Sequence, residues 1–387
     1  MSFADRFFRA LTLLSALGLA ACGGNVTEPS PSVEVGRGSA APSPNAAVPT
    51  EPPSAVSIPD APRPPAAYPI PVGTGATALA RDGKYLYFAW TEQRTTEVIA
   101  RTLLSGGPVE RIATHGVPYD VSKSLAVTAT HVLFRSDHSL FAFAKSASSP
   151  VALTTPISAD PMPASVTRVV AELDGKRGFY VAGPDVFAVD GASAAWAPVL
   201  DGLTPNERRS VSALAAGDGA VFAVTTGIDY SATPMEWATV SRLDVDGATV
   251  SRVKLDGRGG AAAASVAQGR LVIAWGDRID VLDAKTLGAP STTPLTGAPE
   301  VVAITATPRG LFFIQRQAPD PYGKLDGLML TGAANALAAS APSMLSDGGA
   351  PRLGAELVAD DAHVYWVRRD PARPNMDAPG VIERVAK

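Results

Sequence analysis

Seven short runs of aromatic and β-branched residues recur along this chain, and their spacing constrains the fold more than any other feature. Each run lies in the same kind of unit: a strand of small residues, a turn with Asp or Gly, the aromatic run, a variable loop and a hairpin. With one residue per run taken as equivalent, the spacings are 46, 47, 42, 50, 40 and 53 residues. The equivalent residues are Leu86, Val132, Phe179, Val221, Leu271, Leu311 and Val364. Because one unit of this length cannot bury its own apolar face, the units are expected to stack on one another.

Residues 73–387 contain no long amphipathic helical pattern, and Gly, Asp, Pro and Ser separate their apolar runs. Repeats of this length that consist only of strands are typical of the blades of a β-propeller. The sequence therefore predicts an all-β fold, a seven-bladed β-propeller over residues 73–387, preceded by a signal peptide and a disordered Pro-rich linker. The second strands of the blades are expected at residues 85–88, 131–134, 179–181, 221–224, 271–273, 311–314 and 363–366.

Asp-Gly pairs lie at the predicted turns. Asp82-Gly83, Asp174-Gly175 and Asp218-Gly219 fall between first and second strands, where a tight hairpin needs positive φ. Asp246-Gly247 is expected to join a third and a fourth strand. The acidic stretch at residues 244–247 lacks the remaining ligand positions of a calcium loop, so we expect no metal there.

The first 21 residues are typical of a secretion signal, with Arg6 and Arg9 before an apolar stretch that is too short to span a bilayer. The sequence at residues 19–22, Leu-Ala-Ala-Cys, resembles the lipobox of bacterial lipoproteins. That resemblance implies cleavage before Cys22, the single cysteine of the chain, and attachment of diacylglycerol and palmitate to it. Gly23 after the cysteine implies sorting to the outer membrane, on its periplasmic or surface-exposed side. The alternative is an ordinary signal peptide with a chance cysteine.

Residues 22–72 are predicted to be a linker, because Gly23 to Val72 hold 13 of the 34 prolines and few charges. Such a segment favours an extended, solvated conformation and acts as a semi-rigid spacer. The chain reaches Lys387 soon after the expected third strand of the last blade. We therefore expect residues around Tyr68 to Val72 to supply a fourth strand on the outer edge of that blade, where proline is tolerated.

The charge balance excludes some partners. The formal net charge is -4, and loss of residues 1–21 leaves 31 basic and 36 acidic side chains. Nucleic acid is therefore not an expected partner. No cluster of Lys or Arg suited to an anionic lipid surface stands out, so membrane attachment depends on the lipid.

The two ends of the repeat region resemble a known group of propellers. Residues 363–366, His-Val-Tyr-Trp, followed by residues 381–385, are similar to the tyrosine-tryptophan blade motif of YWTD and NHL-type propellers. Residues 79–88, with Gly106-Gly107-Pro108, resemble the same pattern. The middle units lack the Tyr-Trp pair, so the resemblance covers the domain as an architecture and only its ends as a motif.

Catalytic and metal-binding motifs are mostly absent from the sequence, which has no G-x-S-x-G, H-E-x-x-H, C-x-x-C or phosphate loop. The four histidines lack ligand spacing, and two of them share a repeat position, which indicates a structural role. Three tryptophans that end or follow second strands are expected to pack between blades rather than to stack on a cofactor. These residues are His115, His131, His138 and His363, and Trp90, Trp275 and Trp366. We expect no metal and no cofactor.

Candidate binding residues lie in the loops between second and third strands, which open on a usual ligand face of propellers. The longest are expected at residues 225–238, 315–326 and 368–379, and the sixth, seventh and first units are neighbours in the ring. Guanidinium groups in that sector would suit carboxylate or phosphate groups; the alternative is solvated loops that tolerate insertions. The candidates are Arg94, Gln315, Arg316, Tyr322, Arg368, Arg369 and Asp370.

These features predict a lipid-anchored envelope protein, a monomer, whose propeller is a binding or scaffold module for a protein or polysaccharide partner. Whether the chain is an enzyme stays open. The alternative is a propeller enzyme such as a lactonase or a carbohydrate-active hydrolase, with carboxylates such as Glu300 and Glu356 near the channel mouth. The positions of these two glutamates do not match between units.

Overall fold

The computed structural model describes residues of the compact unit Asp60–Lys387. The described residues are 68, 70–93, 95–116, 124–136, 139–157, 166–191, 193–194, 208–229, 235–244, 248–256, 259–261, 263–275, 277–295, 300–317, 324–331, 343–346, 357–369 and 380–387. Every regular element in these ranges is a β-strand, as the sequence predicts. In these ranges no helix has the length and apolar character needed to cross a membrane.

The strands follow one another in a regular order along the chain. They are β1 (Ile70–Val72), β2 (Thr74–Arg81), β3 (Tyr85–Glu92), β4 (Thr96–Leu103), β5 (Glu110–Gly116), β6 (Ser124–Val127), β7 (His131–Ser136), β8 (Ser139–Ala144), β9 (Val151–Ala152), β10 (Val166–Ala171), β11 (Arg177–Ala182), β12 (Asp185–Asp190), β13 (Ser193–Ala194), β14 (Arg208–Gly217), β15 (Ala220–Asp229), β16 (Met235–Asp244), β17 (Thr249–Asp256), β18 (Ala263–Ala267), β19 (Arg270–Ala274), β20 (Arg278–Asp283), β21 (Ser291–Pro294), β22 (Glu300–Thr307), β23 (Gly310–Gln317), β24 (Lys324–Thr331), β25 (Ser343–Ser346), β26 (Val358–Ala359), β27 (His363–Arg369) and β28 (Gly380–Ala386).

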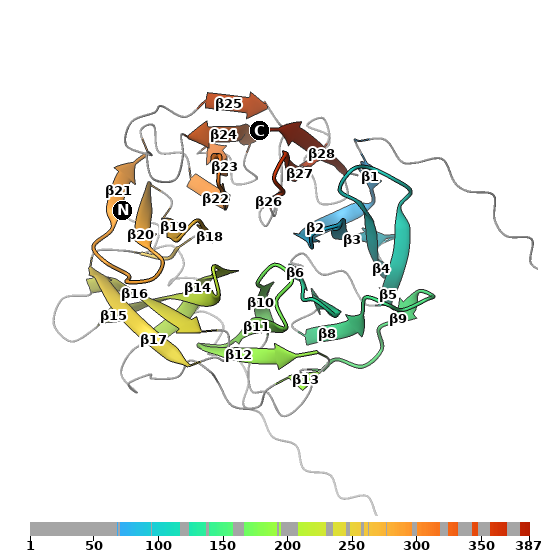
Figure 1. Cartoon of the computed structure of the whole chain (residues 1–387), viewed down its shortest axis with the longest axis horizontal. Coiled ribbons are helices and arrows are strands. Elements are labelled where there is room, and N and C mark those ends of the chain that lie inside the picture. Colours follow the sequence, from blue (N-terminus) through green and yellow to red (C-terminus); the bar gives the residue numbers. More distant parts are fainter. Residues whose placement is uncertain are drawn as a thin grey trace, which may run out of the picture. The chain divides into compact units, whose positions relative to one another are not determined.

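The described strands form separate sheets around a common axis, with the first strand of each unit innermost (Figure 1). Neighbouring strands are antiparallel except for β5 and β9. This arrangement is a β-propeller. From the axis outward the sheets are β2-β3-β4-β5-β9, β6-β7-β8, β10-β11-β12-β13, β14-β15-β16-β17, β18-β19-β20-β21, β22-β23-β24-β25 and β26-β27-β28-β1. The second strand of every sheet contains the aromatic run that the repeat pattern assigned to it, so all seven second strands are confirmed.

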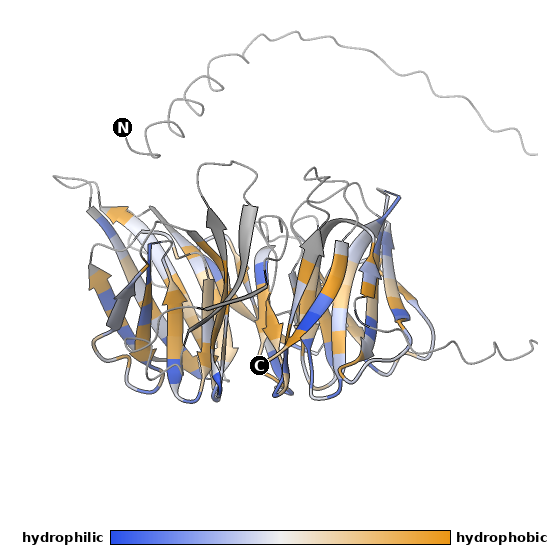
Figure 2. Ribbon diagram, turned by 90° about the horizontal axis from the view of Figure 1, so that it is seen from above, coloured by the Kyte–Doolittle hydropathy of each residue, from blue (hydrophilic) through white to orange (hydrophobic). Residues whose placement is uncertain are grey.

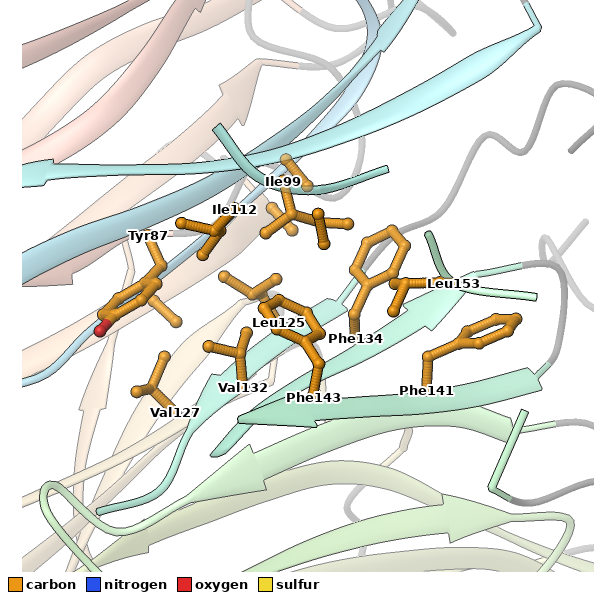
Figure 3. Close-up of a cluster of buried hydrophobic side chains, with 14 residues drawn as sticks. Tyr87, Ile99, Ile112, Leu125, Val127, Val132, Phe134, Phe141, Phe143 and Leu153 are labelled. Carbon is orange, nitrogen blue, oxygen red and sulfur yellow. The ribbon is translucent and has the colours of Figure 1, made fainter. Parts of the chain in front are cut away.

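Hydrophobic cores lie between neighbouring sheets. Because side chains of a strand alternate between its two faces, one strand contributes to two cores. In β3, Phe88 packs with Tyr365 of the last sheet, whereas Tyr87 packs with Phe134 of the second sheet. Figure 3 shows the core between the first and second sheets, and Figure 2 shows apolar residues along the strands throughout the ring. Burial on both faces explains why the second strands read as continuous apolar runs.

The number of complete blades differs from the prediction of seven. Among the described residues, six sheets have four or more strands, and β6-β7-β8 has three. The strand expected to complete it, β9, pairs instead in parallel with β5 of the first sheet, with Ala113 opposite Val151. This placement buries Leu153, which is 6% exposed, in the core between the two sheets. Burial of that side chain favours the exchange.

The predicted closure of the ring is confirmed. Strand β1 pairs antiparallel with β28, with Ile70 opposite Ile382, Pro71 opposite Val381 and Val72 opposite Gly380. Pro71 is exposed on the outer edge, where its missing N–H costs no ladder bond. The last sheet therefore takes in residues 70–72, which precede the expected start of the propeller at residue 73.

The predicted turn geometry holds at some positions and is wrong at others. Asp218 and Gly219 have φ of 54° and 73°, as expected, and β16 and β17 form the expected hairpin. At the Asp174-Gly175 turn Asp174 has the expected positive φ, 56°, and Gly175 does not; Gly83 does not have positive φ either. At Asp82 the side chain shapes the turn instead, because Oδ1 accepts hydrogen bonds from the amides of Lys84 (2.8 Å) and Tyr85 (2.7 Å). Asp246 and Gly247 lie outside the described residues.

The long loops expected between second and third strands are shorter in the structure. Pairing continues to Asp229 opposite Met235 in the fourth sheet, to Gln317 opposite Lys324 in the sixth and to Arg369 opposite Gly380 in the last. The strands extend beyond their apolar runs because the ladder needs only backbone groups, which polar residues supply equally well.

Candidate functional site

Four of the predicted binding residues are described by the structure, and they belong to strands and not to loops. Gln315 and Arg316 belong to β23, and Arg368 and Arg369 belong to β27. These two strands hold the same place in adjacent sheets, so their ends lie on the same face of the ring. The other candidates, Arg94, Tyr322 and Asp370, lie outside the described residues, as do Cys22 and Glu356.

The inner strands enclose a central channel of about 810 Å³, and all seven sheets contribute to its wall. Most wall residues are apolar, such as Ala126, Ala264 and Val302. The charged wall residues are Arg81, Arg135, Arg168, Glu172, Asp218, Asp360, Asp361 and Lys387. The wall therefore combines apolar side chains with polar and charged ones.

Five of these charges, Arg81, Glu172, Asp218, Asp360 and Asp361, are at or beside the turns between first and second strands. We call the face that carries these turns the turn face; in the described residues it comprises 82–84, 128–130, 172–176, 218–219, 268–269, 308–309 and 360–362. Glu172 Oε1 accepts a hydrogen bond from the amide of Gly219 (2.7 Å), and Asp218 Oδ2 accepts one from Gly269 (2.6 Å). Both carboxylates therefore tie one sheet to the next.

The first and last sheets share a buried Asp-Tyr arrangement. Tyr87 donates its hydroxyl hydrogen to Asp82 Oδ2 (2.9 Å), and Lys145 Nζ lies 2.5 Å from the same oxygen. Burial opposes ionisation of Asp82, but hydrogen bonds from Lys145 and from the amides of Tyr85 and Lys84 outweigh it and lower the pKa of the carboxyl. Burial raises the pKa of Tyr87, and Asp82 raises it further. The pair thus stays an ionised carboxylate and a neutral phenol.

The same arrangement in the last sheet links it to the first. Tyr365 donates to Asp360, and its hydroxyl also lies 3.3 Å from the carbonyl oxygen of Leu104. Arg384 donates to that carbonyl at 3.1 Å and stacks over the ring of Tyr68 at 4.3 Å. Burial raises the pKa of Tyr68 to about 12. These contacts hold the join between the two ends of the ring.

A buried polar cluster lies between the first and second sheets. Glu97 is 1% exposed, accepts a hydrogen bond from Ser136 and lies opposite His115 in the β4–β5 ladder. His115 Nδ1 is 2.6 Å from the carbonyl oxygen of Leu153, and its ring is 4.3 Å from that of Phe141. Since a carbonyl only accepts, Nδ1 carries the proton. The cluster fastens β9 to the first sheet and does not line the channel.

The remaining predictions on histidine and tryptophan concern packing. His131 and His363 begin the second strands β7 and β27, as their shared repeat position predicts. Trp90, Trp275 and Trp366 are 6%, 8% and 3% exposed, and each lies in a core between two sheets, which confirms their packing role. In the described part of the chain no group of three or more His, Cys, Asp or Glu side chains is placed to hold a metal ion.

Comparison with solved structures finds matches at low sequence identity. The crystal structure of the computationally designed Ika8 protein is 13% identical, with a TM-score of 0.48 over 81% of this chain and 98% of that chain. A chain in the crystal structure of the mitotic checkpoint complex is 11% identical, with a TM-score of 0.43 over 64% of this chain and 72% of that chain. No family model and no curated protein matches the sequence.

One group of charged residues was not predicted from the sequence. Arg81 ends β2, Arg309 lies in the turn before β23, and Lys387 follows β28; they come from the first, sixth and last sheets. Lys387 and Arg81 line the channel on the turn face, beside Asp360 and Asp361. A repeat alignment places Arg81 and Arg309 at the first-to-second-strand junction of their units, but only the folded ring brings Lys387 to them.

Proposed function

We propose that the chain is a lipid-anchored envelope lipoprotein whose propeller serves as a binding or scaffold module for a protein or polysaccharide partner. The pairing of β1 with β28 is the observation that carries this proposal. The segment that leads out of the Pro-rich stretch is itself the outer strand of the last sheet. A pulling force on such a tether acts on the hydrogen-bonded pairing of β1 with β28. This arrangement suits a domain that is held at a membrane surface.

The anchor in this proposal is Cys22, with diacylglycerol and palmitate on the mature N-terminus after loss of residues 1–21. Residues 22–72 act as the spacer, up to the strand at its end. The proposed location is the outer membrane, on its periplasmic or surface-exposed side, and the proposed state is a monomer. Support comes from the Leu-Ala-Ala-Cys sequence at residues 19–22 and from the 13 prolines between Gly23 and Val72.

The channel wall favours binding over acid-base chemistry. The wall carboxylates Glu172, Asp218 and Asp360 each accept hydrogen bonds from backbone amides, and Asp360 also accepts one from a tyrosine. A general acid or base needs a group that gains and loses a proton at the working pH, whereas hydrogen bonds from Tyr365 and from the amides of Ala362 and His363 lower the pKa of Asp360. These side chains are committed to holding the ring together.

We also propose that β6-β7-β8 counts as a seventh blade and that the ring is related to YWTD and NHL-type propellers. A hydrophobic core separates this sheet from each neighbour, as elsewhere in the ring. The Asp-Tyr hydrogen bonds of the first and last sheets occur where the sequence resembles that group.

Two measurements test the proposal. In cell fractionation, the full chain is expected in the membrane pellet and the Cys22→Ser variant in the soluble fraction; a variant that still pellets contradicts the anchor. The soluble variant is then screened against glycan arrays and envelope extracts. A partner retained without turnover supports the binding module, whereas hydrolysis of a lactone or glycan, or a stoichiometric divalent metal, would favour the enzyme.

A further inference from the structure

Three cationic residues come from adjacent sheets at the turn-face mouth of the channel. Arg81 and Lys387 line the channel, and Arg309 lies in the exposed turn of the sixth sheet. Burial lowers the pKa of Lys387; Asp360 and Asp361 raise it in part, and Arg81 and Arg309 lower it further. The geometry agrees, because the ammonium group of Lys387 lies 5.9 Å from the ring of Phe312 in the sixth sheet. Strand β26 of the last sheet also contacts β2, which ends at Arg81, and β22, which ends two residues before Arg309.

The backbone holds each of these residues in place. Arg81 pairs with Leu86 in the β2–β3 ladder. The amide of Arg309 donates to Thr307 Oγ1 at 3.2 Å, and that hydroxyl donates to the carbonyl of Gly310 at 3.1 Å. The amide of Lys387 donates to the carbonyl of Ala362 at 3.0 Å, and its ammonium group donates to the carbonyl of Asp360. The cations are thus presented by fixed backbone.

Local acidic groups do not neutralise this cluster. The carboxylate of Asp360 accepts hydrogen bonds from the amides of Ala362 and His363 and from the hydroxyl of Tyr365. In the described part of the chain, no carboxylate forms an ion pair with Arg81 or Arg309. Asp360 and the exposed Asp361 are the acidic residues beside Lys387. The other turn-face carboxylates of the channel wall, Glu172 and Asp218, belong to the third and fourth sheets, where each accepts a hydrogen bond from a backbone amide.

We propose that Arg81, Arg309 and Lys387 form a binding site for one anionic group, a carboxylate or a phosphate, at the turn-face mouth of the channel. Guanidinium groups bind the oxygens of such groups through paired N–H donors, and an ammonium group adds a point charge. The mouth is open, so the group can belong to a free small anion or to a residue of an acidic polymer. The site does not depend on the lipid anchor or on the loops between second and third strands.

The test is calorimetric titration of the full chain at low ionic strength, with inorganic phosphate and acetate as free anions and polygalacturonate as the polymer. We expect saturable binding of at least one free anion. Arg81→Ala and Arg309→Ala should each weaken it by about threefold, as for partly exposed charge pairs. Asp361→Asn should strengthen it, because it removes a repelling charge beside the site. A purely structural role for these residues predicts no such gain.

Lys176→Ala is the matched control, since Lys176 is an exposed cation of the turn face on the third sheet. It should bind as the unaltered chain does. Arg309 lies in an exposed turn, so Arg309→Ala should keep the melting temperature and remain informative if Arg81→Ala is unstable. Equal weakening of polygalacturonate binding in both arginine variants assigns the site to polymers, and an effect on phosphate or acetate alone assigns it to free anions. The absence of saturable anion binding, or equal binding by all variants, overturns the proposal.

Discussion

The hydroxyl of Tyr365 donates a hydrogen bond to Asp360 Oδ2 at 2.5 Å, across the turn that joins the inner two strands of the last sheet. The same relationship joins Tyr87 to Asp82 at 2.9 Å in the first sheet. In both sheets the other carboxylate oxygen accepts hydrogen bonds from two amides of the turn. One aspartate therefore fixes a turn and positions a buried tyrosine, at the two sheets that meet where the ring closes.

Asp360→Asn should destabilise the ring in a pH-dependent way. Burial disfavours the charged form of Asp360, but hydrogen bonds from Tyr365 and from the amides of Ala362 and His363 prevail, so the pKa in the folded state lies below its ordinary value of 3.8. With a depressed folded pKa, the stabilisation is complete above the unfolded pKa and is lost as pH falls through the folded one. At neutral pH we expect a loss of about 1–3 kcal/mol, from hydrogen bonds to a charged group. The difference should shrink in urea titrations below pH 3.8. Asp361→Asn, next in the chain, is the control and should keep the acid dependence of the unaltered chain.

Removal of residues 64–72 should destabilise the propeller. It deletes β1, in which Ile70 and Val72 are 1% and 5% exposed, and it deletes Tyr68, whose ring lies 5.9 Å from that of Tyr365. Loss of two buried aliphatic side chains costs about 3–6 kcal/mol. Differential scanning calorimetry should show a lower melting temperature. Deletion of residues 50–58 shortens the Pro-rich stretch equally and should leave the melting temperature unchanged; if both deletions behave alike, β1 does not close the ring.

Gly73 is expected to tolerate no side chain. It lies where the chain passes from the outer strand of the last sheet to the inner strand of the first, and a Cβ atom would be 2.3 Å from Trp90 Cδ1 and 2.6 Å from the carbonyl oxygen of Thr91. Gly73→Ala should therefore cost about 1–3 kcal/mol, as overpacking does. Gly116→Ala is the control, because no atom lies within 4 Å of its added Cβ. Chemical denaturation should show a lower midpoint for Gly73→Ala alone.

The fold was largely predictable because it depends on periodicity. Each second strand is buried on both faces, so the residues at Leu86, Val132 and their equivalents had to be apolar in every unit. The closing strand was predictable because Ile70 and Val72 alternate with prolines, a pattern that an outer edge strand tolerates. The pairing of β9 with the first sheet was not predictable. A two-residue strand such as Val151–Ala152 is too short for its sequence to indicate which sheet it joins or in which direction it pairs.

The candidate site was less predictable, for a physical reason. Gln315 and Arg369 were assigned to loops because polar residues in a strand carry no apolar pattern, although the ladder includes them. Arg81, Arg309 and Lys387 are far apart in sequence, and their proximity depends on the closure of the ring. Sequence spacing predicts charge clusters only when one strand or loop presents all of their residues. It does not predict clusters that form when distant sheets of the ring come together.

Leu153→Ala should loosen the segment that contains β9 and Leu153, which packs against the first two sheets. Leu153 is 6% exposed in the core that includes Phe141, its amide donates to the carbonyl of Thr114 at 2.8 Å, and its carbonyl lies 2.6 Å from His115 Nδ1. Removal of a buried leucine side chain costs about 2–5 kcal/mol. Because β9 is only two residues long, we expect much of that loss to appear as local opening, seen as faster hydrogen exchange of the Leu153 and Ile157 amides. Leu173→Ala is the matched control, since Leu173 is 47% exposed, and it should change stability by less than about 0.5 kcal/mol. Unchanged exchange in Leu153→Ala would mean that backbone pairing and His115 alone hold β9 in place.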